Sequence, residues 1–262
     1  MLIEYAYETG RFENVLSDLS EIFEPVVAPG MAVKLYADRN HKTTGPFLDT
    51  TDLDITVFMK RKVDSKTELR KYVSMAYERF DDACEEYARF IGAKLIKRCP
   101  GTKNQDCPVN MTRKQGSPFF DRHVYAFKKY YIQYPKHDEL HELMDVVIVY
   151  QSGVPSDIVN RRIRFGFPVP KVKYLIRELE SMVRVDILGP SPFNQKRHPV
   201  TGKESLKGVK DLYRLQYILT LSRNREFDPI RRKVRHLLNI LRKDTYSDEQ
   251  KSRRLREVLN DK

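Results

Sequence analysis

Asp52 and Asp54 stand two positions apart in the segment DTTDLDITV (residues 49–57), where a polar turn leads into an apolar strand. Alternate side chains of a strand point to opposite faces, so we expect both carboxylates on the face opposite Leu53 and Ile55. Two carboxylates this close repel each other, and folding alone has no use for that repulsion. A divalent cation removes the conflict, and Mg²⁺ (or Mn²⁺) is typically held by a few carboxylates together with substrate phosphates. The pair therefore predicts a metal site for phosphoryl transfer; the alternative is a solvated turn.

A third carboxylate is expected from a second strand. Asp145 lies in the apolar run LMDVVIVY (143–150), where burying an aspartate is costly unless it is paired or ligates something. Asp186, in the similarly apolar VRVDIL, is the rival candidate. We favour Asp145, because its strand belongs to the same part of the chain as Asp52 and Asp54.

Hydrophobic periodicity predicts the elements that position these carboxylates. Apolar residues recur every three or four positions over 11–24 and 66–92, which predicts two helices. Pro25 and Pro29 would end the first helix and Gly92 the second. The remaining predictions are a short helix or strand over 30–40, strands over 53–59, 93–97, 123–134 and 143–150, a turn over 135–139, and a helix beginning near Pro170.

A change in composition near residue 166 divides the chain into two parts. Residues 1–166 read as a mixed catalytic domain with an exposed loop insertion at 99–122, and residues 167–262 as a mostly helical, basic domain. The predicted fold class is α+β, with a mixed sheet flanked by helices in the first domain. Cys84 is expected in the core of the 66–92 helix, and Cys99 and Cys107 as ordinary loop thiols.

The compartment and the partners follow from composition and charge. No run approaches about 18 apolar residues, and the N-terminus lacks a signal-peptide pattern, so we expect an intracellular, cytoplasmic protein without a membrane partner. The formal charge of +12 favours a polyanionic partner. From Val209 onward there are 15 Lys/Arg against 8 Asp/Glu, an excess of 15 − 8 = 7. Nucleic-acid contacts are expected at Arg231, Arg232, Lys233 and Arg235, the alternative being a solvated helix face.

These motifs together resemble the nucleotidyltransferase superfamily, whose DNA polymerase β-like fold is shared by poly(A) polymerases and nucleotide-adding toxins. Gly30 in APGMAVKLY matches the first glycine of the family's helix-and-turn motif, and TTDLDI matches its Asp-x-Asp metal strand. MDVVIVY matches the strand of the third carboxylate, and KGVKDLYRL (207–215) is similar to a later Lys-x-x-Lys-Asp helix. Met31 departs from the pattern, because the family has a second glycine or a serine there.

The resemblance implies a metal-dependent enzyme that transfers a nucleoside monophosphate from an NTP, expected to be ATP, to a hydroxyl of RNA or tRNA. Asp52, Asp54 and Asp145 would be the catalytic metal ligands. The nucleotide would contact Gly30, the backbone of Met31, Lys34, Thr51, Lys207 and Lys210. The alternative is an inactive relative that serves as an RNA-binding subunit or adaptor, which Met31 favours. The loop insertion favours a viral source, with a location in the virion or the host cytoplasm.

Overall fold

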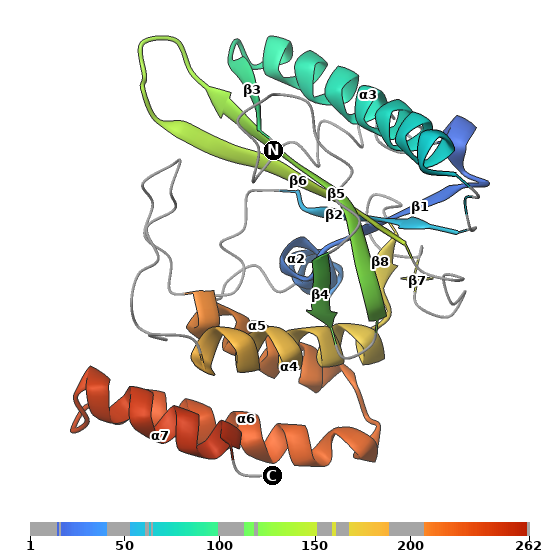
Figure 1. Ribbon diagram of the computed structural model, residues 1–262. Coiled ribbons are helices and arrows are strands. Elements are labelled where there is room, and N and C mark those ends of the chain that lie inside the picture. Colours follow the sequence, from blue (N-terminus) through green and yellow to red (C-terminus); the bar gives the residue numbers. More distant parts are fainter. Residues whose placement is uncertain are drawn as a thin grey trace. The chain divides into compact units, whose positions relative to one another are not determined.

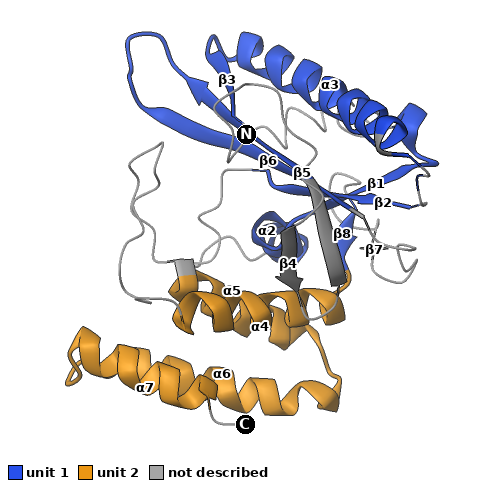
Figure 2. Cartoon of the chain, in the orientation of Figure 1, with its two compact units in different colours: residues 1–41, 50–170 blue, residues 42–49, 171–262 orange. Residues whose placement is uncertain are grey.

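The computed structural model divides the chain into two compact units (Figure 2). Unit 1 comprises residues 1–41 and 50–170, and unit 2 comprises residues 42–49 and 171–262. The division after Pro170 lies four residues beyond the boundary expected from composition, since 170 − 166 = 4. The structure describes residues 15, 17–40, 53–60, 63, 65–98, 113–117, 120–150, 159–160, 168–188 and 207–260. No helix in these ranges is both long and apolar enough to cross a membrane.

A mixed sheet forms the centre of unit 1 (Figure 1). Its strand order is β1 (Phe23–Val27), β2 (Ile55–Met59), β6 (Leu140–Tyr150), β5 (Phe120–Gln133) and β3 (Lys94–Arg98), and β4 (Arg113–Ser117) pairs with β5 outside this order. The β2–β6 pair is parallel, and the other pairs are antiparallel. Two short strands, β7 (Val159–Asn160) and β8 (Val169–Pro170), form a separate ladder. The predicted α+β class with a mixed sheet is confirmed.

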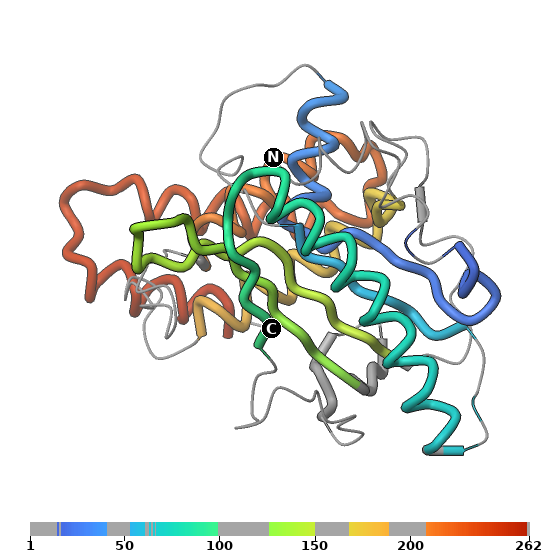
Figure 3. The backbone as a smooth tube through the Cα atoms, turned by 90° about the horizontal axis from the view of Figure 1, so that it is seen from above, coloured from blue at the N-terminus to red at the C-terminus, as the bar shows by residue number. Residues whose placement is uncertain are grey.

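Two helices of unit 1 lie on opposite sides of this sheet (Figure 1). Helix α3 (Lys66–Phe90) follows the N-cap Ser65, whose hydroxyl accepts a hydrogen bond from the Glu68 N–H at 3.1 Å. The chain leaves α3 through Gly92, whose φ of 67° suits glycine, so the predicted helix is confirmed. Seen from above in Figure 3, α3 lies over the strands. Helix α2 (Pro29–Arg39) lies on the other side, and it resolves the helix-or-strand alternative over 30–40.

Side-chain alternation gives each face of the sheet its own character. On β6, Met144, Val146 and Ile148 are fully buried on the side covered by α3, and Cys84 of that helix is buried as predicted. Asp145, Val147 and Val149 point to the other side. There Val149 packs with Val26 and Phe58 into a small apolar cluster, next to which lies Val147.

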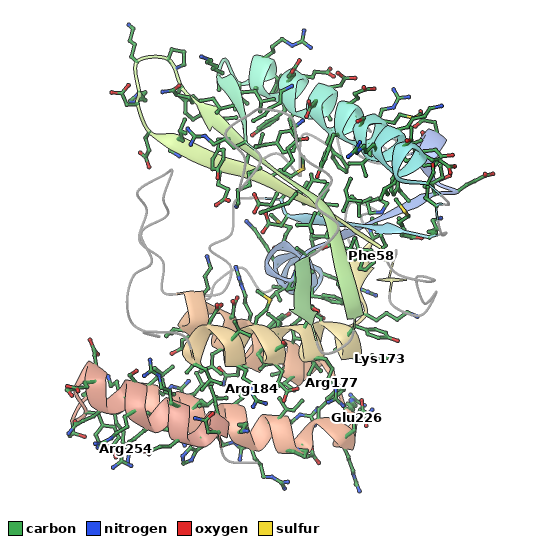
Figure 4. All side chains as sticks on the ribbon, viewed as in Figure 1. Phe58, Lys173, Arg177, Arg184, Glu226 and Arg254 are labelled. Carbon is green, nitrogen blue, oxygen red and sulfur yellow. The ribbon has the colours of Figure 1, made fainter. Side chains whose placement is uncertain are left out.

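Unit 2 is helical, as predicted. Its elements are α4 (Val172–Leu188), α5 (Lys207–Leu221), the 3₁₀ turn η3 (Arg225–Phe227), α6 (Asp228–Leu241) and α7 (Asp248–Asn260). Each helix turns an apolar stripe inward, and the fully buried residues of the unit include Leu175, Leu179, Leu212, Ile218, Leu237 and Leu255. Arg177 of α4 lies over the Phe227 ring, 5.3 Å from its centroid (Figure 4).

Two sequence predictions were wrong in part. The helix over 11–24 is replaced, among its described residues, by a 3₁₀ turn at Ser17–Leu19 and by the start of β1 at Phe23. Strand pairing outweighed the helical period here, and Pro25 is tolerated because β1 is an edge strand. Pro29 therefore begins α2 rather than ending a helix. The predicted loop over 99–122 contains β4 and the first residues of β5, although its residues 99–112, with Cys99 and Cys107, lie outside the described residues.

Candidate functional site

Two of the three predicted carboxylates meet on neighbouring strands. The parallel register that pairs Ile55 with Val146 sets Asp54, the residue directly before β2, beside Asp145 of β6. The Asp145 N–H donates to Asp54 Oδ1 at 3.3 Å, and one residue earlier the Leu53 N–H donates to the Leu143 carbonyl at 3.0 Å. Asp145 thus stands in the middle of its strand, not at its start. Asp52 and Thr51 lie outside the described residues.

The rival third carboxylate is in a different setting. Asp186 lies on α4 in unit 2, so the VRVDIL segment is helical and not a strand. A Cβ atom placed on Gly208 would come within 3.2 Å of Asp186 Cβ, which shows how closely α5 approaches α4 here. Asp145 is the candidate for which the described residues show a hydrogen bond to Asp54.

Lys129 of β5 completes the cluster, and sequence reasoning missed it. Its ammonium donates to Asp145 Oδ2 and, at 2.6 Å, to Glu142 Oε1. Asp145 is its direct cross-strand neighbour on β6. Glu142, three residues earlier, would face the opposite side of a regular strand. A bulge shifts the register between Tyr130 and Tyr131, so that Glu142 pairs with Tyr131 and turns to the face that carries Asp145.

The protonated state of Lys129 is strongly favoured. Burial alone would lower the pKa of its ammonium, but the neighbouring Asp145 carboxylate and then Glu142 outweigh burial and raise that pKa. Burial also raises the pKa of the Tyr131 phenol to about 12, with Lys129 acting in the opposite direction. The cluster therefore carries a fixed positive charge between negative ones at neutral pH.

The donors present fit a hard divalent ion only in part. Asp54 and Asp145 are carboxylates from adjacent strands, which is the donor type that Mg²⁺ takes together with water and phosphate oxygens. Within the described ranges, no group of three or more metal-binding side chains is found, but Asp52 lies outside those ranges. Lys129 competes for Asp145, because it already neutralises that carboxylate. An ion would have to share Asp145 with the lysine or displace it.

Helix α2 begins directly beside this cluster. The Ala28 N–H, at the N-cap position, donates to the main-chain oxygen of Asp54 at 2.8 Å. No side chain caps the helix, and its first turn holds Gly30 and Met31. The N–H groups of a first turn have no partner within the helix, so they suit an anion. The Met31 side chain is only 2% exposed and packs into the core, so a ligand at this residue would have to contact its backbone.

The predicted phosphate-binding lysines belong to different parts of the molecule. Lys34 is half-buried, one turn into α2. Lys207 and Lys210 lie on α5 in unit 2, where the following Asp211 is fully buried and accepts a bond from Arg214 at 2.6 Å. The Lys-x-x-Lys-Asp segment thus supplies a buried ion pair to the helical unit, and Lys210 is half-buried beside it.

The four predicted nucleic-acid contacts on α6 separate into two kinds. Arg231 bonds to the Asp228 carboxylate and to the main-chain oxygens of Leu219, Ser222 and Asn224, so it closes the end of α5. Lys233 is half-buried, near the Glu180 carboxylate of α4. Arg232 and Arg235 are exposed.

No protein-family model, no curated protein and no solved structure matches this chain. The site therefore has to be interpreted from its own geometry and charges.

Proposed function

We propose that this protein is a metal-dependent nucleotidyltransferase, which transfers a nucleoside monophosphate from an NTP, with ATP as the first candidate, to a hydroxyl of an RNA acceptor. The observation that carries the proposal is the contact of Asp54, directly before β2, with Asp145 of β6, whose N–H donates to Asp54 Oδ1, beside a helix N-terminus without a side-chain cap. Carboxylates next to an anion-binding helix end are what a magnesium-bound triphosphate requires. The segment TTDLDI adds Asp52 as the third expected ligand.

Each described residue has a definite task in this proposal. Asp54 and Asp145 hold Mg²⁺ or Mn²⁺, which supplies Lewis-acid stabilisation of charge on the phosphate oxygens. The first turn of α2, with the N–H groups of Gly30 and Met31, receives phosphate oxygens. Asp145 is also placed to orient the acceptor hydroxyl or to take its proton. Lys129 holds the Asp145 carboxylate in place, and its charge favours an incoming polyanion.

Nucleotide incorporation tests this proposal directly. The protein is incubated with each labelled NTP in turn, with Mg²⁺ or Mn²⁺ and mixed RNA, and labelled product is measured. We expect incorporation that falls at least about a hundredfold in Asp54→Asn and in Asp145→Asn, because several kcal/mol of charge stabilisation are removed. Asp186→Asn is the matched control and should retain activity, since Asp186 lies on α4. Incorporation that survives in both site variants, or is absent with every NTP and either metal, contradicts the proposal.

Two observations favour a second function. Lys129 already neutralises Asp145, and Met31 stands where the family has glycine or serine. Both features suit a chain that keeps the architecture without the reaction and serves as an RNA-binding subunit or adaptor. Salt-sensitive RNA binding without incorporation under any metal would favour this function over the enzyme.

A further inference from the structure

Helix α6 presents a continuous basic surface to solvent. At 100° per residue, its exposed positions from Arg232 to Asn239 fall within an arc of roughly 100°, spread along about 10 Å of the helix axis. We call this surface the α6 stripe. Its members are Arg232, Arg235, His236 and Asn239 on the helix, Arg242 at its C-cap and Lys243 just beyond it. The one acidic residue of α6, Asp228, lies one turn before Arg232 and bonds to Arg231. The opposite face of α6 is buried through Ile230, Val234, Leu237 and Leu238.

Within the described ranges, no hydrogen bond or ion pair ties the side chains of the stripe's arginines to the rest of the fold. Arg231, their neighbour, bonds to one carboxylate and three main-chain oxygens. By contrast, Arg232, Arg235 and Arg242 form no ion pair with any carboxylate in the part of the chain that the structure describes. Their charges contribute nothing visible to the stability of unit 2. A helix held rigidly by its apolar face presents them at fixed spacing.

The stripe continues past the end of α6 around an aromatic side chain. Lys243 Nζ lies 5.0 Å and the Arg254 guanidinium 4.7 Å from the centroid of the Tyr246 ring (Figure 4 labels Arg254). This ring holds a cation from α7 near the last cation of the stripe. Acidic residues follow at Asp244, in the turn, and at Asp248, the first residue of α7, so the uninterrupted positive surface ends at Lys243.

We infer that the α6 stripe is a docking surface for the phosphate backbone of single-stranded RNA. Regularly spaced cations without carboxylates neutralise a row of phosphates, and exposed Asn239 adds a neutral hydrogen-bonding group. A membrane fits less well, because interfacial helices insert an apolar face, and that face of α6 is buried in the unit. A protein partner fits less well too, since the stripe lacks the apolar and aromatic anchors of protein interfaces.

This inference is independent of the nucleotidyltransferase reaction. The stripe belongs to unit 2, whereas Asp54 and Asp145 belong to unit 1. RNA binding by the stripe is expected for an enzyme and for an adaptor alike, and it requires neither NTP nor metal.

The test is fluorescence anisotropy of the full chain with a labelled single-stranded RNA of mixed sequence, about 20 nucleotides long, without metal or NTP. The stripe variant carries Arg232→Gln, Arg235→Gln and Arg242→Gln. The control variant carries Arg70→Gln, Lys71→Gln and Arg89→Gln, which remove the same charge from exposed positions of α3 in unit 1. Thermal melting by circular dichroism verifies that both variants fold.

We expect the stripe variant to bind RNA on the order of tenfold more weakly than the control variant at moderate salt. The slope of log affinity against log salt should also fall by about 2, because three phosphate contacts each contribute about 0.7 for a single strand. Equal affinity and equal slope in the two variants would overturn the inference, as would a wild-type chain that does not bind RNA. If the wild-type chain does not bind RNA but co-sediments with phosphatidylserine vesicles, and the stripe variant does not, the stripe is a membrane-binding surface instead.

Discussion

Each face of the sheet in unit 1 carries an ion pair between a lysine and an aspartate, but the groups that surround the two pairs differ. Consecutive lysines of β5 point to opposite sides. On the side covered by α3, Lys128 bonds to both oxygens of Asp81 at 2.7 and 2.8 Å, and Asp81 also accepts from Tyr130 and Lys97. On the other side, Lys129 bonds to Asp145. The first cluster has one central carboxylate surrounded by donors, and the second has a lysine among carboxylates.

This difference separates a structural network from a candidate site. Around Asp81, each hydrogen bond brings a donor to the carboxylate, so that its charge is compensated from three residues. Around Lys129, the carboxylates of Asp145 and Glu142 share one ammonium, and Asp54 adds a further negative charge beside them. The excess of negative charge around Lys129 favours a further cation, whereas the charge of Asp81 is already compensated by the lysines that bond to it.

The largest effect on stability is expected on the α3 side. Asp81→Asn removes the charge that compensates Lys128, whose side chain is only 11% exposed. Breaking a buried pair from one side should lower the free energy of unfolding by about 3 kcal/mol. Glu85→Gln is the control, because Glu85 is about half exposed and bonds to Lys97 at the surface, so a few tenths of a kcal/mol are expected. Urea unfolding measures both, and equal losses would show that Asp81 is not the centre of the network.

A smaller loss, and one that an ion can repair, is expected on the other side. Lys129→Met leaves Asp145 and Glu142 without their ammonium and should cost about 2 kcal/mol. Because the lysine no longer competes, about 10 mM Mg²⁺ should then raise Tm more in Lys129→Met than in the wild type. The melting shift is measured with Mg²⁺, with Mn²⁺ and with EDTA, using Asp81→Asn as a variant that metal should not rescue. If neither metal moves Tm in any of these proteins, the ion site between Asp54 and Asp145 is ruled out.

The sequence was sufficient for those parts of the site that depend on local pattern. Alternation in LDITVFM and in LMDVVIVY predicted two strands, and β2 and β6 prove to be parallel neighbours, with Asp54 beside Asp145. The periodicity of 66–92 likewise predicted α3. β2 and β6 are far apart in the chain, and their parallel pairing depends on the arrangement of the whole sheet. The sequence therefore predicted that Asp54 and Asp145 would be close only if these two strands were neighbours.

The sequence missed two features of the structure. One depends on the register between β5 and β6, and the other on the competition between helix formation and strand pairing in residues 11–24. Lys129 and Glu142 reach the same point because one residue is inserted into β6, and a bulge of that kind leaves no mark in hydrophobic alternation. The paired lysines of YAFKKYYIQY were the available signal, since a charged residue on each face of a central strand needs a partner on each side. The segment 11–24 has a helical period, but its last residues gain more by pairing with β2.

Alkaline pH should lower the free energy of unfolding through groups on both faces of the sheet. The loss is gradual, because it follows the titration of these groups. The pKa of Lys129 is raised by its carboxylates, and burial raises the pKa of Tyr131 to about 12 and that of Tyr130 as well. A pKa that is higher in the folded chain gives stability that is complete below the unfolded value, about 10, and is lost as pH rises above it. Free energies of unfolding measured between pH 8 and about 11 should therefore fall, with tyrosinate absorbance rising as the chain unfolds. Tyr131→Phe should make this fall shallower, and an unchanged pH dependence would contradict the assignment to Tyr131.

The smallest effect should also have the opposite sign. Tyr77 lies on the α3 side, and its buried hydroxyl has no hydrogen-bond partner within the described part of the chain, whereas the Tyr130 hydroxyl donates to Asp81 at 2.8 Å. Both rings lie near the Lys128 ammonium, at 5.2 and 5.6 Å, so replacing either tyrosine by phenylalanine keeps the apolar surface and changes mainly the hydroxyl. Tyr130→Phe should cost about 1 kcal/mol.

Tyr77→Phe, by contrast, should leave the free energy of unfolding unchanged or raise it by up to about 1 kcal/mol, because a buried hydroxyl without a partner is a cost of folding. Paired urea titrations of the two variants at neutral pH measure this difference. Equal destabilisation would mean that both hydroxyls are bonded, and the α3 side would then hold a larger polar network than the one centred on Asp81. The two substitutions should have opposite effects on the free energy of unfolding. Removing a buried hydroxyl that has no hydrogen-bond partner stabilises the folded chain, whereas removing a hydrogen-bonded hydroxyl destabilises it.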